Sequence, residues 1–214
     1  MQIEVAGAAL RLLPQRAAFL PETGLLLVAD LHLGKAQSFR RLGVPVPSGT
    51  TAESLARLDA AIAATGATAI AFLGDLIHSA RAKSPATWEA VAAWRAGHPD
   101  LALTLVRGNH DRHAGDPPPE WGIACVEEPH RVGPFALAHH PEPMSGAYVL
   151  AGHLHPAVWL GGRAHDALRL PCFHFGAAVG VLPSFGAFTG SHVLRRAAGD
   201  RVYAVHDGGV VALP

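Results

Sequence analysis

The sequence has few cysteines, no excess of either charge and no long apolar run. Its two cysteines, Cys125 and Cys172, are too few for a disulfide framework, so we expect buried thiols in a reducing compartment. Lys plus Arg and Asp plus Glu number 17 each, so no global field attracts nucleic acid or an anionic membrane, and a polyanion must be recognised locally. No run approaches the roughly 18 apolar residues that a membrane span needs. We therefore expect a cytoplasmic protein without a membrane partner.

The pattern along the chain favours a single domain over residues 1–214, a length that suits one continuous core. Charged residues interrupt the alanine-rich start, which predicts a first strand over residues 8–13 rather than a signal peptide. Residues 54–65 place apolar side chains on one helical face, and Pro85 begins a second helix. After about residue 129, Gly and Pro divide the sequence into short strands. Two packed sheets with helices outside are the economical arrangement.

Five apolar runs end in residues that can bind a transition metal. These residues are Asp30 and His32, Asp75 and His78, Asn109, His110 and Asp111, His139 and His140, and His153 and His155. Any one of these groups alone could be a surface turn, but together they indicate one site, because the carboxyl ends of strands in an open α/β sheet converge on a crevice.

The donor types predict a metal centre. In an extended strand residues i and i+2 point to the same side, so Asp30 and His32 could hold one ion together, and His153 and His155 repeat that spacing. The donors are nitrogen and oxygen without thiolate, which suits Mn, Fe or Zn. We expect a metalloenzyme with two ions.

These residues stand in motifs that resemble the calcineurin-like metallophosphoesterase superfamily. The motifs are Asp30-x-His32, Gly74-Asp75, Gly108-Asn109-His110-Asp111, the strand-end His139 and Gly152-His153-x-His155. The resemblance implies an α/β fold, a four-layer sandwich of two mixed β-sheets flanked by α-helices, and two divalent metal ions. It implies one ion held by Asp30, His32, Asp75 and His155, and a second held by Asp75, Asn109, His139 and His153. His110 would be the catalytic histidine, acting beside the shared Asp75.

Longer motifs at residues 30–35, 74–79, 152–156 and 182–190 resemble a bacterial branch of that superfamily, the DNA-ligase-associated phosphoesterases. This branch is described as manganese-dependent DNA endonucleases and phosphodiesterases. The resemblance implies Mn as the metal, with Fe or Zn as alternatives, DNA as the substrate and a role in DNA repair. It also implies DNA ligase and helicase as repair partners.

Basic residues close to the metal motifs are candidates for binding substrate phosphates, although a solvated charged rim is the alternative. They are Lys35, Arg81, Arg107 and Arg112. So few contacts imply a small footprint, which a single-stranded segment fits more easily than a duplex groove.

Two histidines are ambiguous. His78 stands where several branches of the superfamily carry an acidic residue that orients the catalytic histidine. A neutral imidazole could orient His110 by hydrogen bonding, but it cannot hold an imidazolium as a carboxylate does. His140 adjoins His139, and strand alternation would let only one of them face the ions; we favour His139.

Two other functions stay open at this point. A small-molecule phosphoesterase, such as a nucleotidase or dinucleotide hydrolase, would use the same ions. A protein-binding scaffold without turnover would be expected to have lost ligands, whereas all the ligand positions and His110 are present here.

Overall fold

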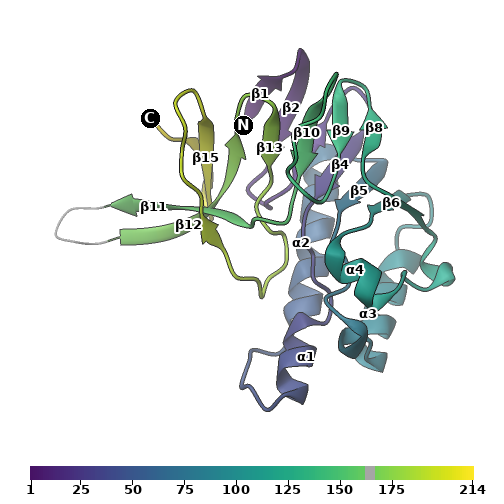
Figure 1. The fold of residues 1–214 in the computed structure, drawn as a ribbon. Helices are drawn as coiled ribbons and strands as arrows, with labels where there is room; N and C mark the ends of the chain where they lie inside the picture. Colours follow the sequence, from purple (N-terminus) through teal and green to yellow (C-terminus); the bar gives the residue numbers. More distant parts are fainter. Residues whose placement is uncertain (162–166) are drawn as a thin grey trace.

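The computed structural model describes residues 1–161 and 167–214 and contains two β-sheets packed face to face, with helices on the other side of the first sheet (Figure 1). The four α-helices within these residues all lie before residue 115. This arrangement confirms the predicted α/β class with two mixed sheets flanked by helices. None of the described helices is both long enough and apolar enough to cross a membrane.

The first sheet has seven strands in sequential order. They are β1 (Gln2–Val5), β2 (Ala8–Leu12), β3 (Ala18–Leu20), β4 (Leu25–Val28), β5 (Ala69–Leu73), β6 (Ala102–Val106) and β7 (Ile123–Val126). Strands β1 to β4 pair antiparallel, whereas β4 to β7 pair parallel. The strand predicted over residues 8–13 is present as β2, but it is not the first, because β1 precedes it and pairs with it at the edge of the sheet.

The parallel strands are apolar on both faces because both faces are buried. In β4, Leu26 and Val28 pack into the core shared with the helices. The alternate residues Leu27 and Ala29 pack into the core between the two sheets. The continuous apolar runs seen in the sequence therefore arise because this sheet lies between the helices and the second sheet.

The second sheet collects the C-terminal strands in the order β14-β11-β12-β13-β10-β9-β8, with β15 pairing to β12 and β16 to β15. The strands are β8 (His130–Val132), β9 (Phe135–Leu137), β10 (Tyr148–Ala151), β11 (Pro156–Gly161), β12 (Ala167–Phe175), β13 (Val179–Val181), β14 (His192–Val193), β15 (Arg201–His206) and β16 (Gly209–Ala212). Strands β9, β10 and β13 are parallel, so their carboxyl ends share one edge.

The helices are α1 (Lys35–Arg41), α2 (Thr50–Thr65), α3 (Pro85–Ala96) and α4 (Asn109–Ala114), with 3₁₀ turns at Ala80–Ala82 and Pro119–Trp121. Helix α3 begins at Pro85 as predicted, and the Ser84 hydroxyl accepts a hydrogen bond from the Thr87 N–H at 3.3 Å. The sequence analysis missed α1 and α4, because helices of 7 and 6 residues are too short for a periodic apolar face to be recognised.

The two cysteines differ in their surroundings. Cys172 is fully buried, as expected, and burial raises the pKa of its thiol to about 12. Cys125 is only partly buried, so the prediction of two buried thiols was right for one of them.

Candidate metal centre

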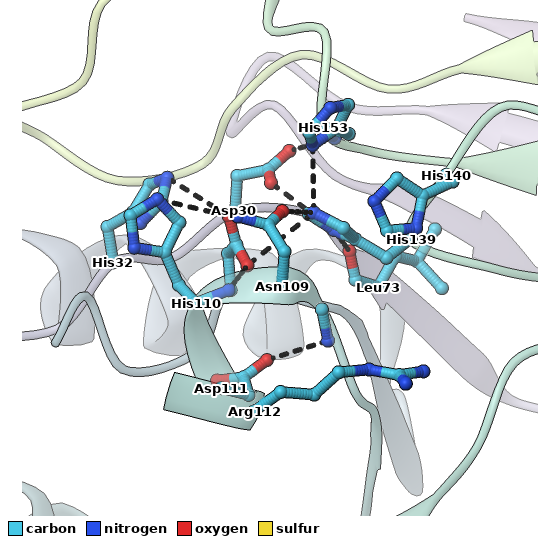
Figure 2. A network of polar contacts seen from close by, with 12 residues as sticks. Asp30, His32, Leu73, Asn109, His110, Asp111, Arg112, His139, His140 and His153 are labelled. Carbon is cyan, nitrogen blue, oxygen red and sulfur yellow. Dashed lines mark hydrogen bonds and ion pairs between the residues drawn. The ribbon is translucent and has the colours of Figure 1, made fainter. Parts of the chain in front are cut away.

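All the residues predicted to bind metal lie together where strands of the two sheets end. Asp30 and His32 follow β4, Asp75 follows β5, and Asn109 follows β6, whereas His139 follows β9 and the pair His153 and His155 follows β10. Figure 2 shows most of these side chains pointing toward one another between the sheets. The parallel registers of β4 with β5 and β6, and of β9 with β10, bring these loops to a common edge.

The ring nitrogens and oxygens form two neighbouring groups. On one side, His139 Nε2 lies 2.9 Å from Asn109 Oδ1, 3.0 Å from His153 Nδ1 and 3.5 Å from Asp75 Oδ1. On the other side, His155 Nε2 lies 3.4 Å from His32 Nε2 and 3.5 Å from Asp30 Oδ1. Asp75 reaches both groups, since its Oδ2 is 3.8 Å from His32 Nε2.

The backbone that positions these side chains is not extended, so the argument from strand alternation was wrong. Asp30 and His32 have φ angles of 54° and 49°, Asp75 has 52°, and His153 and His155 have 69° and 47°. This left-handed region costs non-glycine residues about 1–3 kcal/mol each and persists only where the surroundings impose it. The side chains converge because each loop turns sharply after its strand, not because the strand continues.

Hydrogen bonds between the loops impose this geometry. Asp30 Oδ2 accepts the His153 N–H at 2.9 Å, and Asp75 Oδ1 accepts the His110 N–H at 2.9 Å. The buried Asp111 accepts the N–H groups of Gly108 and Ile77 at 3.0 and 3.1 Å. Asp111 therefore holds the loops together, although its residue type also suits a metal ligand.

Two glycines in the motifs are required by close packing against carboxylates. A Cβ at Gly152 would lie 2.6 Å from Asp30 Oδ2, and one at Gly108 would press on Asp75 Oδ1. Any larger residue would displace the side chain that the glycine supports.

The tautomers of the histidine rings follow from their outer hydrogen bonds. His139 Nδ1 lies 3.1 Å from the Leu73 carbonyl, and His155 Nδ1 lies 3.1 Å from the Gly190 carbonyl. Because a carbonyl can only accept, each Nδ1 must carry the proton, and each Nε2 is left with a lone pair that faces the centre. Histidines that bind metals use the same arrangement.

These lone pairs and carboxylates fit bound cations. Asp30 is fully buried, and its Oδ1 has no hydrogen-bond partner among residues 1–161 and 167–214. Acceptors facing one another across such distances repel unless a cation lies between them. Neighbouring ligands of an ion with bonds of about 2.1 Å stand about 3.0–3.4 Å apart, close to the separations found here. The buried cluster of His and Asp side chains could therefore hold metal ions.

Burial also favours the neutral form of candidate ligand histidines. It lowers the pKa of His139, and it lowers the pKa of His32 well below the usual range, with Lys35 and His155 adding to the effect. Burial raises the pKa of Asp75. Neutral imidazole is the form that binds metal.

His110 lies at the edge of the centre, with its Nε2 3.9 Å from Asp75 Oδ2 and its side chain 37% exposed. Its Nδ1 is 2.6 Å from the backbone carbonyl of His78, and the two rings stack at 4.8 Å. The expectation that the His78 imidazole might orient His110 is therefore replaced by orientation through the His78 backbone. A backbone carbonyl is present whatever the side chain at position 78, so this contact with His110 does not depend on an acidic residue there.

The four predicted substrate-binding residues are placed differently. Lys35 is partly buried next to His32. Burial lowers the pKa of its ammonium group, and the negative charges of Asp30 and Asp75 oppose that shift. Arg81 is exposed.

Both remaining arginines are paired with carboxylates. Arg107 binds Asp116 at 2.7 Å and Glu127 at 3.0 Å, and Arg112 binds Glu127 at 2.8 Å. Among the four, Lys35 is the one whose charge interacts with the cluster, through His32, Asp30 and Asp75.

The sequence analysis did not identify Glu128, which contacts both residues of the His139–His140 pair. Its Oε2 accepts the N–H groups of His139 and His140 at 2.8 and 3.0 Å, and its Oε1 lies 2.7 Å from His140 Nδ1. Glu128 is 11 residues before His139 and belongs to no motif, so no local signal could have revealed it.

Comparisons with known proteins bear on the family of the chain. No family model matches the sequence, and no curated protein matches it. The crystal structure of Pseudomonas putida nuclease MPE is similar over 100% of this chain and 99% of that chain, with 42% sequence identity and a TM-score of 0.87. Yfce, a phosphoesterase from E. coli, is similar over 87% of this chain and 90% of that chain, with 14% identity and a TM-score of 0.43. From the full-length likeness to the nuclease, together with the motifs, we conclude that the chain belongs to the calcineurin-like metallophosphoesterase family.

Proposed function

We propose that the chain is a dinuclear, manganese-dependent phosphodiesterase that cleaves single-stranded DNA during DNA repair. The observation that carries this proposal is the convergence of buried lone pairs and carboxylates, whose repulsion bound cations would relieve. The similarity to a nuclease over the full length supports a nucleic acid substrate.

We assign Asp30, His32, Asp75 and His155 to one cation, and Asp75, Asn109, His139 and His153 to the other. Two bound divalent cations supply an activated water nucleophile and positive charge beside the phosphoryl group. The role of the chain is to hold these donors rigidly, which the hydrogen bonds between the loops achieve.

His110 has the position of a proton donor. Its ring is partly exposed where substrate would enter, and its Nδ1–H is held by the His78 carbonyl at 2.6 Å. When Nε2 carries a proton, it can be given to the leaving oxygen of the cleaved ester, a role that contributes about 10² to 10⁴ in rate.

Lys35 would bind a substrate phosphate next to the cleaved one, and the exposed Arg81 is a second candidate. Since Arg107 and Arg112 are occupied by carboxylates, few free cationic groups surround the centre. A small footprint of this kind suits a flexible single strand, and the logarithmic salt slope of binding should be no steeper than roughly −3. A steep slope would contradict the small footprint.

A panel of substrates with Mn²⁺ tests the proposal. Single-stranded circular DNA and a bis-aryl phosphodiester should be hydrolysed, an aryl phosphomonoester and nucleotides should be poor substrates, and Asp75→Ala should be inactive on all four. Preference for nucleotides would instead identify a small-molecule phosphoesterase.

We also infer that residues 1–214 form one domain that acts in the cytoplasm beside DNA ligase and helicase. The core shared by the two sheets supports a single cooperative unit. One thermal transition is expected, and two separate transitions would contradict it. Co-purification from cells, with Asp75→Ala as an inactive bait, tests the partners.

A further inference from the structure

His139 and His140 are consecutive, yet both rings lie at the candidate metal centre (Figure 2). Strand β9 ends at Leu137, and the chain bends at both histidines. In an extended strand consecutive side chains point to opposite faces, but this bend turns both toward His153. Their ring centroids lie 4.8 Å apart, and those of His140 and His153 lie 4.7 Å apart. One ring nitrogen from each of the three histidines lies within 4.8 Å of the ring nitrogens of the other two.

Glu128 determines which nitrogen of His140 is free. Its Oε1 lies 2.7 Å from His140 Nδ1, and its Oε2 already accepts two backbone N–H groups. A carboxylate accepting these bonds is ionised, so Nδ1 is the protonated nitrogen and Nε2 has the lone pair. A carboxylate behind a histidine is the arrangement that fixes the tautomer and raises the basicity of metal ligands.

We propose that His140 is a further ligand of the cation bound by His139 and His153, and that Glu128 is the residue that positions it. This inference rests on the metal centre of the proposed function, but it concerns a residue outside the family motifs found in the sequence. The cation on this side would then have three imidazoles, whereas the cation at His32 and His155 has two. More nitrogen donors favour Zn²⁺ or Fe²⁺ over Mn²⁺.

Metal titration of the full-length protein tests the proposal without any assay of hydrolysis. The protein is stripped with a chelator, and Zn²⁺ and Mn²⁺ are titrated separately against a competing chromophoric chelator. His140→Gln should weaken one of the two binding steps by about 10- to 100-fold, more for Zn²⁺ than for Mn²⁺, and leave the other step unchanged. Glu128→Gln keeps the size of the side chain and should weaken the same step by about tenfold. His206→Gln, which changes an exposed histidine on β15, is the matched control and should bind as the wild type does.

The visible absorption of the Co²⁺-loaded protein gives a second readout, since loss of an imidazole ligand changes the spectrum in His140→Gln but not in His206→Gln. Circular dichroism of the stripped proteins checks folding, and His140→Asn replaces His140→Gln if the latter does not fold. Unchanged affinities and an unchanged spectrum in a folded His140 variant would overturn the inference, even if turnover fell. If the wild type took up no cation, the proposed function itself would be contradicted. If the wild type bound two cations and His140→Gln bound them equally well, only the inference about His140 would be contradicted.

Discussion

The two sides of the candidate metal centre each contain two histidines but differ in their oxygen donor, Asp30 on one side and Asn109 on the other, and in their surroundings. On the His32 side, formed by Asp30, His32 and His155, the outer nitrogen of His155 meets a neutral carbonyl, and Lys35 lies near His32. On the His139 side, formed by Asn109, His139 and His153, the carboxylate of Glu128 stands behind the histidine pair.

This difference has a consequence for affinity. On the His32 side the negative charge of Asp30 is offset by the nearby Lys35, whereas on the His139 side the neutral Asn109 is supplemented by the negative charge of Glu128 behind the ligands. We therefore expect tighter binding on the His139 side and easier exchange on the His32 side. Equal affinities for the two cations would break this comparison.

The largest effect is expected from Asp75, because it belongs to both sides. Its Oδ2 is 3.8 Å from His32 Nε2, and its Oδ1 is 3.5 Å from His139 Nε2. Asp75→Ala should weaken both cations and lower hydrolysis by at least about 10³-fold. Metal content and turnover are measured together, with the exposed Asp116→Asn as the control. Loss of only one cation would show that Asp75 serves a single side.

Substitution of His110 should lower catalysis without lowering metal binding. Because His110 touches the centre only at its edge, His110→Gln should lower kcat by about 10² or more with both cations retained. Metal analysis and steady-state kinetics of the same preparation check this. A loss of metal on the His32 side would instead place His110 among the ligands, since its ring lies 5.2 Å from that of His32.

Basic residues on the two sides should contribute unequally to substrate binding. Lys35 lies on the His32 side and has no ion pair among residues 1–161 and 167–214, so Lys35→Gln should raise KM for DNA about tenfold with little change in kcat. Arg112, near the His139 side, is held by the exposed Glu127, and Arg112→Gln should change KM by less than about threefold. The reverse order would show that the Arg112 pair opens when DNA binds.

The smallest effect is expected on stability in acid. It concerns His78, whose ring lies 5.3 Å from that of His32. Burial, with Lys35 and His110 nearby, lowers the pKa of His78 from 6.5 to about 4. Between these values the unfolded chain binds more protons than the folded protein, so stability falls as the pH falls. His78→Gln should flatten the pH dependence of Tm of the metal-free protein in this window. An unchanged slope would mean that other groups dominate it.

Local sequence patterns predicted a large part of the fold and of the centre. The apolar runs of β4, β5, β6, β9 and β10 and the start of α3 at Pro85 were recognised, because burial on both faces and helix capping leave a trace within a few residues. The prediction that the candidate metal-binding residues lie together followed from a similar rule, since the carboxyl ends of parallel strands share one edge.

The sequence by itself thus determined which side chains reach the centre, but only the tertiary structure decided how they are held there. The left-handed backbone at Asp30 and His153, the carboxylate of Glu128 behind His140 and the pairing of Arg107 with Asp116 all depend on partners in other elements. The bond between Asp30 and His153 joins residues 123 positions apart. No local pattern records such a contact, because it exists only after the two sheets have packed together.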